Sequence, residues 1–190
     1  QPIQQSEISL TLPHSQFSAV LNSAEQSLAE FDWMQASVAL QKIPVDGLSS
    51  NDDTYVGYLQ ARIAYIRGDQ LQALEQLEQL NYPGINPALH YRILSFKHYI
   101  LETQGDSLAS AQLADQILRG TQADTAAAWK RSVWQNLERT DKQQLLTAFP
   151  NAADPQWRGW LALALINRHT DSEMQRECPL RRQLHRAGHK

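Results

Sequence analysis

The hydrophobic residues of this chain recur at helical spacing. In residues 69–81, DQLQALEQLEQLN, Leu71, Leu74 and Leu77 lie three residues apart, and Ala73 and Leu80 fall beside them. This spacing places the apolar side chains on one face of an amphipathic helix. No segment shows the alternation of apolar and polar residues, bounded by turns, that indicates a strand. The pattern predicts an all-α fold with helices at about 15–30, 32–43, 52–67, 69–81, 87–104, 106–119, 123–138, 141–149 and 155–168.

Three of the predicted helices repeat one another at intervals of 37 residues. Asp32, Asp69 and Asp106 each open one of them. An Asp at this position caps the first backbone amides and suits the positive end of the helix dipole. A fixed period in the range of about 20–50 residues is typical of a stacked repeat array. We therefore predict a tetratricopeptide-like, right-handed array of antiparallel helix pairs, an α-α superhelix, with corners at 30–32, 67–69 and 104–106.

The period also aligns a small residue near the start of each repeated helix. These residues are Ala36, Ala73 and Ser110. A small side chain lets a neighbouring helix approach closely, while the aliphatic residues that follow fill the space between repeats. We expect Ala73 to be buried where it faces the first helix of its own repeat.

The first helix of the middle repeat carries a row of aromatic and basic residues. Tyr55, Tyr58, Arg62 and Tyr65 lie at intervals of three, four and three residues, on one face. In tetratricopeptide arrays this face lines the concave groove. One period later the row continues, and Tyr with Arg is a favoured composition of recognition surfaces. The continuation reads Arg92, Ser95, Tyr99 and Glu102.

Two interpretations of this row stay open. In the first, Tyr55, Tyr58, Arg62, Tyr65, Arg92 and Tyr99 bind a partner. Glu25 and Glu102 then lie at the two ends of a positive centre, which suits a short extended acidic or aromatic segment. In the second, the tyrosines pack between helices with their hydroxyl groups at the surface, because aromatic rows are commonly part of a core.

Composition limits the classes of partner. The 190 residues include 17 Lys and Arg against 20 Asp and Glu, for a net charge of −3. This balance gives no electrostatic footprint for nucleic acid or for an anionic membrane. Cys178 is the only cysteine, so no intrachain disulfide forms. No apolar run reaches the roughly 18 residues of a membrane span.

Candidate catalytic and metal-binding residues lack the required partners. Cys178, His185 and His189 fall short of four ligands at zinc-finger spacing. His14, His90 and His98 have no Gly-x-Ser-x-Gly or cysteine motif to serve, and no glycine-rich phosphate loop is present. The sequence therefore predicts a protein that is not an enzyme and needs no cofactor or metal.

The C-terminal half resembles a known family. The segment AAAWKRSVWQNLERTDKQQLLTAF, followed by DPQWRGWLALALI, is similar to the N-terminal domain of the LpoA family. In that family a Trp-containing helix leads on to a "GWL" helix, behind tetratricopeptide-like repeats. The resemblance covers roughly residues 15–168. Its matching residues are Trp129, Leu137, Leu145, Gly159, Trp160 and Leu161.

This resemblance implies a function that composition does not reveal. Members of the LpoA family are outer-membrane lipoproteins that activate bifunctional penicillin-binding proteins in peptidoglycan synthesis. It implies a periplasmic protein, tethered to the outer membrane by an acylated N-terminal Cys, whose synthase is contacted mainly through a second, C-terminal domain. We expect both the anchor and that domain to lie outside the 190 residues. The helical domain would then be a spacer and a candidate docking surface.

The alternative function is a generic tetratricopeptide-like adaptor, in any compartment, that binds a peptide or helix in its groove. Three segments are expected under either function. Residues 1–14 form a flexible N-terminal segment, and 15–168 form the helical-repeat domain. Residues 169–190 form a basic tail without apolar periodicity, which we expect to be disordered and which departs from the family after Asn167.

Overall fold

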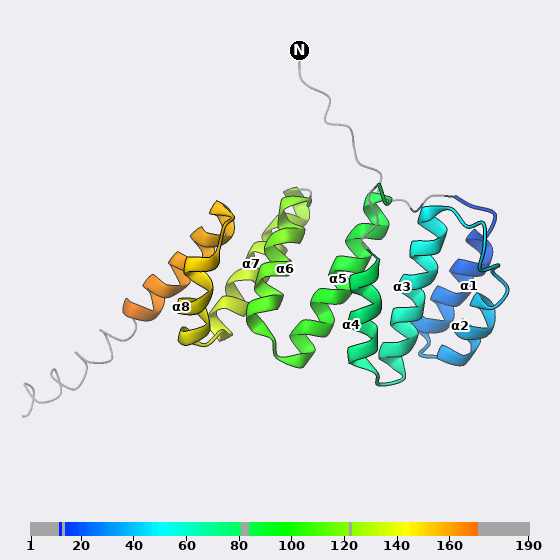
Figure 1. Ribbon diagram of the computed structural model, residues 1–190, viewed down its shortest axis with the longest axis horizontal. Helices are drawn as coiled ribbons and strands as arrows, with labels where there is room; N and C mark the ends of the chain where they lie inside the picture. The colour runs from blue at the N-terminus through cyan, green and yellow to red at the C-terminus, as the bar shows by residue number, and fades with distance from the viewer. Residues whose placement is uncertain (1–11, 13, 81–83, 122, 171–190) are drawn as a thin grey trace, which may run out of the picture. The chain divides into compact units, whose positions relative to one another are not determined.

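The structure is a computed structural model that describes residues 12, 14–80, 84–121 and 123–170. The described residues contain helices and no strand (Figure 1), which confirms the predicted all-α fold and its helix pairs. Residues 155–170 form a helix that follows α8 and carries no label in the figure. The labelled helices are α1 (Ser18–Ala29), α2 (Trp33–Leu40), α3 (Ser50–Ile66), α4 (Gln70–Gln79), α5 (Pro87–Gln104), α6 (Ser107–Arg119), α7 (Ala123–Arg139) and α8 (Lys142–Asn151).

The chain divides into two compact units, and the boundary lies within α5. The N-terminal unit is Gln1–Ile100 and the C-terminal unit is Leu101–Lys190. In the N-terminal unit α1 packs against α2 and α3 against α4, and both α1 and α2 contact α3. In the C-terminal unit α6 packs against α7. The residues predicted as one repeat domain are thus shared between two units.

The predicted corners between helices are confirmed. The helices end and begin again at 29 and 33, at 66 and 70, and at 104 and 107. Each of the three repeated aspartates caps its helix, and Asp141 does the same for α8. The capped amides are those of Gln35 at 3.0 Å from Asp32, Gln72 at 3.0 Å from Asp69, Ala109 at 3.2 Å from Asp106 and Gln143 at 3.2 Å from Asp141.

Several helix ends differ from the prediction by a few residues. α2 ends at Leu40 and not near residue 43. Pro44 disfavours the helical conformation of Ile43, so the helix cannot extend through residue 43. α3 begins at Ser50, two residues before the predicted start, because the Ser49 hydroxyl accepts the amide of Asp52 at 3.1 Å. The last helix reaches residue 170, two residues into the segment expected to be disordered.

Each unit has its own buried core. The three aligned small residues, Ala36, Ala73 and Ser110, are all 0 % exposed, which confirms that Ala73 is buried. Leu12, in the segment expected to be flexible, packs against the core of the N-terminal unit; residues 1–11 and 171–190 lie outside the described residues. The core of the C-terminal unit includes Val133, Leu137, Leu145, Trp157 and Leu161, with Trp129 and Trp160 packed against it.

Candidate functional site

The six residues predicted to bind a partner lie together in the N-terminal unit, on α3 and α5. Tyr55 and Tyr58 are each 6 % exposed and belong to the core, so these two pack as the second interpretation expected. Tyr99 is 51 % exposed, and 37 % of the Arg92 side chain is accessible. The group therefore has a buried floor and an accessible rim. We call these residues, Tyr55, Tyr58, Arg62, Tyr65, Arg92 and Tyr99, the tyrosine–arginine surface.

Glu25 on α1 lies at the centre of the polar part of this surface. The Arg92 guanidinium donates a hydrogen bond of 2.6 Å to Glu25 Oε1, and the Tyr55 hydroxyl donates to Oε2. Arg62 Nη1 lies 3.7 Å from Oε1, which completes an ion pair. Sequence analysis placed Glu25 at one end of a positive centre. That placement is wrong, because Glu25 is one period before Arg62 and its side chain reaches inward between the two arginines.

Glu102, expected at the opposite end of the row, falls in the C-terminal unit. There its carboxylate accepts a hydrogen bond of 2.8 Å from the side-chain amide of Asn136. Ser95, also in the row, has a buried hydroxyl without a hydrogen-bond partner among the described residues. The row of Arg92, Ser95, Tyr99 and Glu102 therefore crosses the boundary between the two units within α5.

The aromatic rings of the surface form a connected series. Tyr55 and Tyr58 stack with their centroids 6.2 Å apart. Phe96 joins Tyr58 to Tyr65 by edge contacts at 6.0 and 5.5 Å, and Tyr65 meets Tyr99 at 5.8 Å. Sequence analysis missed Phe96, because one period earlier its position holds the core residue Leu59. The change from Leu59 in one repeat to Phe96 in the next, beside the row of tyrosines, could have indicated it.

The surroundings of the tyrosine–arginine surface shift the pKa values of Tyr55, Tyr58 and Arg92 upward. Burial first, and the Glu25 carboxylate second, raise the pKa of Tyr55 well above its ordinary value. Burial also raises the pKa of Tyr58, against the opposing effect of Arg62, whose guanidinium lies 5.9 Å from the Tyr58 ring centroid. Burial lowers the pKa of Arg92, but Glu25 and its neighbours outweigh this and the net shift is upward. The arginines thus stay charged beside the Glu25 carboxylate, and the Tyr55 hydroxyl stays protonated as the donor to that carboxylate.

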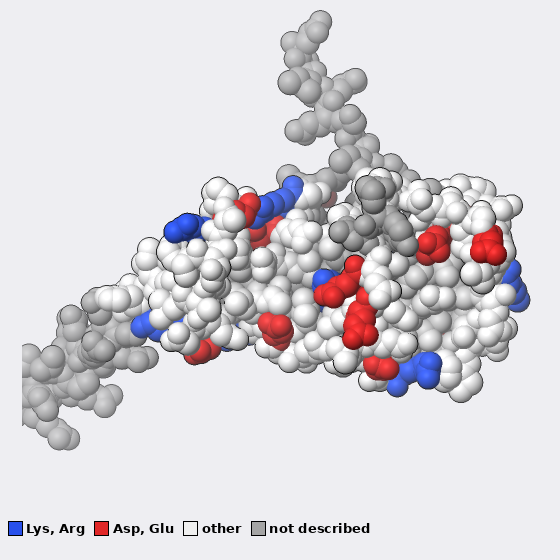
Figure 2. Space-filling view, in the orientation of Figure 1, with Lys and Arg blue, Asp and Glu red and all other residues white. Residues whose placement is uncertain are grey.

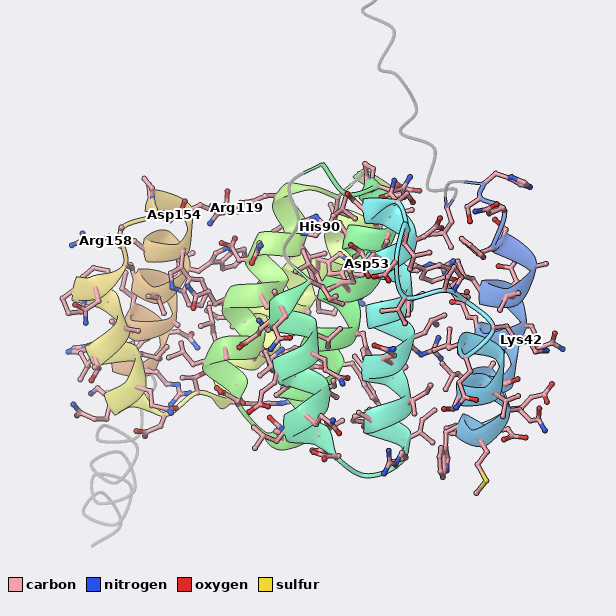
Figure 3. All side chains as sticks on the ribbon, turned by 45° about the vertical axis from the view of Figure 1, so that its right-hand side comes forward. Lys42, Asp53, His90, Arg119, Asp154 and Arg158 are labelled. Atoms are coloured by element: carbon pink, nitrogen blue, oxygen red, sulfur yellow. The ribbon has the colours of Figure 1, made fainter. Side chains whose placement is uncertain are left out.

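Sequence reasoning also missed a polar cluster in the C-terminal unit. Asp115 on α6 is 1 % exposed and accepts hydrogen bonds from Gln156 Nε2 at 2.7 Å and Trp160 Nε1 at 3.1 Å. Arg119 donates to the same carboxylate and makes two bonds of 2.6 Å to Asp154 (Figure 3). This cluster ties α6 to the helix at 155–170.

Three of the residues considered for catalysis and metal binding, His14, His90 and His98, lie in the described part of the chain. His14 and His90 are exposed, with His90 near the start of α5 (Figure 3), whereas His98 is buried. Within the described residues, no group of three His, Cys, Asp or Glu side chains is placed to hold a metal ion. Cys178, His185 and His189 lie outside them.

A concavity of about 840 Å³ lies between α2, α3 and α4. Its polar lining consists largely of glutamine amides, and its apolar lining includes Ile43, Leu48 and Val56. The glutamines that line the concavity are Gln41, Gln60, Gln72, Gln76 and Gln79. On the face of the molecule drawn in Figure 2, charged residues are scattered among uncharged ones.

Comparison with known families decides the class of protein. The chain matches the model of a family described as "LppC putative lipoprotein" over residues 5–183. The chain belongs to the LppC lipoprotein family. The match extends through most of the basic segment after Asn167, where we expected a departure from the resembled family. No curated protein and no solved structure matches the chain.

The family is one of lipoproteins, which are proteins that carry covalently attached lipid. Among the described residues of this LppC-family chain, no helix has both the length and the apolar character needed to cross a bilayer.

Proposed function

We propose that this LppC-family chain is a non-catalytic domain of an outer-membrane lipoprotein that activates a bifunctional penicillin-binding protein in peptidoglycan synthesis. The observation that carries the proposal is the lipoprotein family match over residues 5–183. The resemblance of the Trp129 helix and the "GWL" segment to the LpoA family supplies the finer assignment. The chain acts in the periplasm as a spacer and docking surface, and it takes no cofactor.

The packing of the resembling residues supports this assignment. Leu137, Leu145 and Leu161 are each 0 % exposed and form the core of the C-terminal unit. Trp129 and Trp160 pack against that core. The residues that resemble the LpoA family thus form the core of the C-terminal unit. Their spacing along the chain is therefore fixed by how that core packs.

The docking role is supported by the way helix pairs expose their side chains. In repeat arrays, successive first helices present one face to a partner, and each repeat is stabilised by its neighbours. Here α1, α3 and α5 contribute Glu25, Arg62 and Arg92 to one polar cluster. The docking role proposed for this chain uses this shared face of α1, α3 and α5.

The test uses the full gene product that contains this chain. Purified bifunctional penicillin-binding protein is assayed for glycan polymerisation and cross-linking, with and without the lipoprotein. We expect activation by the lipoprotein and no turnover of lipid-linked precursor or peptidoglycan by the lipoprotein alone. Absence of activation would refute the proposed function, and turnover lost on a single substitution would refute its non-catalytic character.

A swap of the domain separates the spacer role from the docking role. Residues 15–168 are replaced in the full gene product by an unrelated helical array of equal length, and rescue of cells lacking the gene is measured. Rescue equal to that of the natural protein would mean that the chain acts only as a spacer. Partial or absent rescue, with normal abundance of the protein, would indicate a specific surface.

The second candidate is an adaptor that binds a peptide or helix, and the accessible Arg92 and Tyr99 favour it. The upstream gene sequence discriminates the two candidates. A signal peptide ending in a lipobox Cys immediately before Gln1 supports the lipoprotein activator. A start codon that is not followed by a signal peptide supports the adaptor.

A further inference from the structure

We propose that the tyrosine–arginine surface binds an extended acidic segment of a protein partner, and that a carboxylate of this segment takes the place of Glu25 between Arg62 and Arg92. This inference deepens the docking role proposed above and depends on it for its biological context. The chemistry of the exchange rests only on residues of the N-terminal unit.

The first step is a mismatch between donors and acceptors. Arg62 and Arg92 share one carboxylate, that of Glu25, so the cluster keeps a net positive charge. A guanidinium carries five N–H donors in a planar fork that matches a carboxylate with two parallel bonds. The bond from Arg92 is short at 2.6 Å, whereas Arg62 lies 3.7 Å away, beyond hydrogen-bond distance. A second carboxylate would therefore compete only with the weaker contacts of Arg62, which are the 3.7 Å pair with Glu25 and the interaction with the Tyr58 side chain.

The second step is access. The Arg92 and Arg62 side chains are 37 % and 22 % exposed, and Glu25 is 27 % exposed. Part of each of these three side chains is thus in contact with solvent while the core stays closed. Because the ion pair is partly solvated, exchanging one carboxylate for another costs far less than breaking a buried pair would cost.

The third step is the apolar neighbour of the charged cluster. Tyr65 lies one helical turn beyond Arg62 on α3, and its ring contacts both Phe96 and the exposed Tyr99. These rings form an accessible ledge beside the arginines. Aromatic residues beside arginine are the usual energetic centre of a recognition surface. The partner segment therefore carries acidic residues with an aromatic or aliphatic residue close by.

Glu25 has a competing role that the test must separate from ligand mimicry. Its carboxylate joins α1 to α3 through Tyr55 and to α5 through Arg92. If this were its only role, loss of the charge would lower stability and leave acidic ligands unaffected. If it stands in for a ligand, loss of the charge removes a competitor and strengthens binding.

The experiment measures binding of a defined probe to the full chain. The probe is a fluorescein-labelled peptide, Gly-Glu-Glu-Tyr-Glu-Gly, and its counterpart with Gln in place of each Glu. Fluorescence anisotropy is recorded at low and at physiological salt. We expect the acidic peptide to bind and its Gln counterpart not to bind. The affinity of the acidic peptide should fall as the salt concentration rises.

Three variants test the exchange. Glu25→Gln should tighten binding of the acidic peptide by about tenfold, because the competing charge is gone. Arg92→Gln and Tyr99→Ala should each weaken it several-fold. Since Arg92 and Tyr99 are accessible and outside the core, these two variants keep the proposal testable even if Glu25→Gln unfolds. The buried Tyr58 is left intact because its loss would damage the core.

The matched control is Glu78→Gln on α4, which removes one exposed carboxylate that pairs with Lys97 at 3.3 Å. It should leave peptide binding unchanged. Equal binding of the two peptides would overturn the proposal. It would also be overturned if the single variants Glu25→Gln and Arg92→Gln both bound the acidic peptide as the natural protein does. Self-association of the chain that Arg92→Gln abolishes would do the same, because the occupant would then be a second copy.

The peptide assay and the synthase assay fail independently. Peptide exchange without any effect of Arg92→Gln on synthase activation would uphold the binding chemistry and remove the synthase as its partner. Normal activation by a lipoprotein whose surface does not bind acidic peptide would uphold the proposed function and refute this inference.

Discussion

Phe31 and Gly68 share a left-handed backbone conformation. Phe31 lies at the corner between α1 and α2, and Gly68 lies at the equivalent corner between α3 and α4. The φ angles are 60° for Phe31 and 90° for Gly68, and Gly105 at the next corner has 78°. Only the first corner fills this position with a side chain, and that side chain is 77 % exposed. The left-handed region is strained for residues with a Cβ.

Phe31→Gly should therefore stabilise the N-terminal unit. The left-handed conformation costs a non-glycine residue about 1–2 kcal/mol, and the added backbone freedom of Gly in the unfolded chain offsets about 0.5–1 kcal/mol of the gain. We expect a net gain of about 0.5–1 kcal/mol in urea unfolding followed by circular dichroism. Phe31→Ala is the control, since it removes the ring and keeps the strain. If Gly proved less stable than Ala there, strain would not be the dominant effect.

A larger side chain at Ala73 should destabilise the same unit. Ala73 is 0 % exposed on α4, which packs against α3. Ala73→Leu adds volume to a closely packed contact and should cost about 1–3 kcal/mol. The control is Gln72→Leu, at the exposed neighbouring position, where the same side chain meets solvent. Equal unfolding midpoints for the two variants would show that the helix contact has room to spare.

The period of the sequence predicted the elements that depend on local chemistry. The aspartate caps and the buried Ala36 and Ala73 recur because each repeat solves the same packing problem. The position of Glu25 could also have been inferred, since it lies one period before Arg62 in the row. Its pairing with Arg92 could not, because that contact depends on how far two side chains reach across α3.

The 37-residue period could not predict the cluster around Asp115. Its partners Gln156 and Trp160 come from a helix outside the three aligned repeats, so no period connects them with α6. Burial of a carboxylate is also rare without partners, and sequence alone gives no sign of which donors will converge. The site therefore required the packing of α6 against residues more than 40 positions away, as from Asp115 to Trp160.

Loss of the Asp115 carboxylate should destabilise the C-terminal unit. Asp115→Ala leaves the donors of Gln156 and Trp160 without their buried acceptor, which should cost about 1–3 kcal/mol. Four of the five tryptophans lie at positions 129–160, so Trp fluorescence during urea unfolding reports mainly this unit. Asp115→Asn keeps one acceptor oxygen and should lose less. An alanine variant as stable as the natural protein would contradict a structural role for the cluster.

Acid should weaken the C-terminal unit through Asp154. Arg119, and after it the Trp157 amide at 2.8 Å, lower the pKa of the Asp154 carboxyl below its ordinary value. A group with a lowered pKa in the folded state contributes stability above its unfolded pKa, about 3.9, and loses it as pH falls through the folded value. The urea midpoint of the natural protein should therefore fall more steeply below about pH 4 than that of Asp154→Asn. Asn still accepts the Trp157 amide, so the difference isolates the charge, and Asp46→Asn in an exposed loop is the matched control. Parallel pH profiles for the natural protein and Asp154→Asn would show that the Arg119 pair adds no stability.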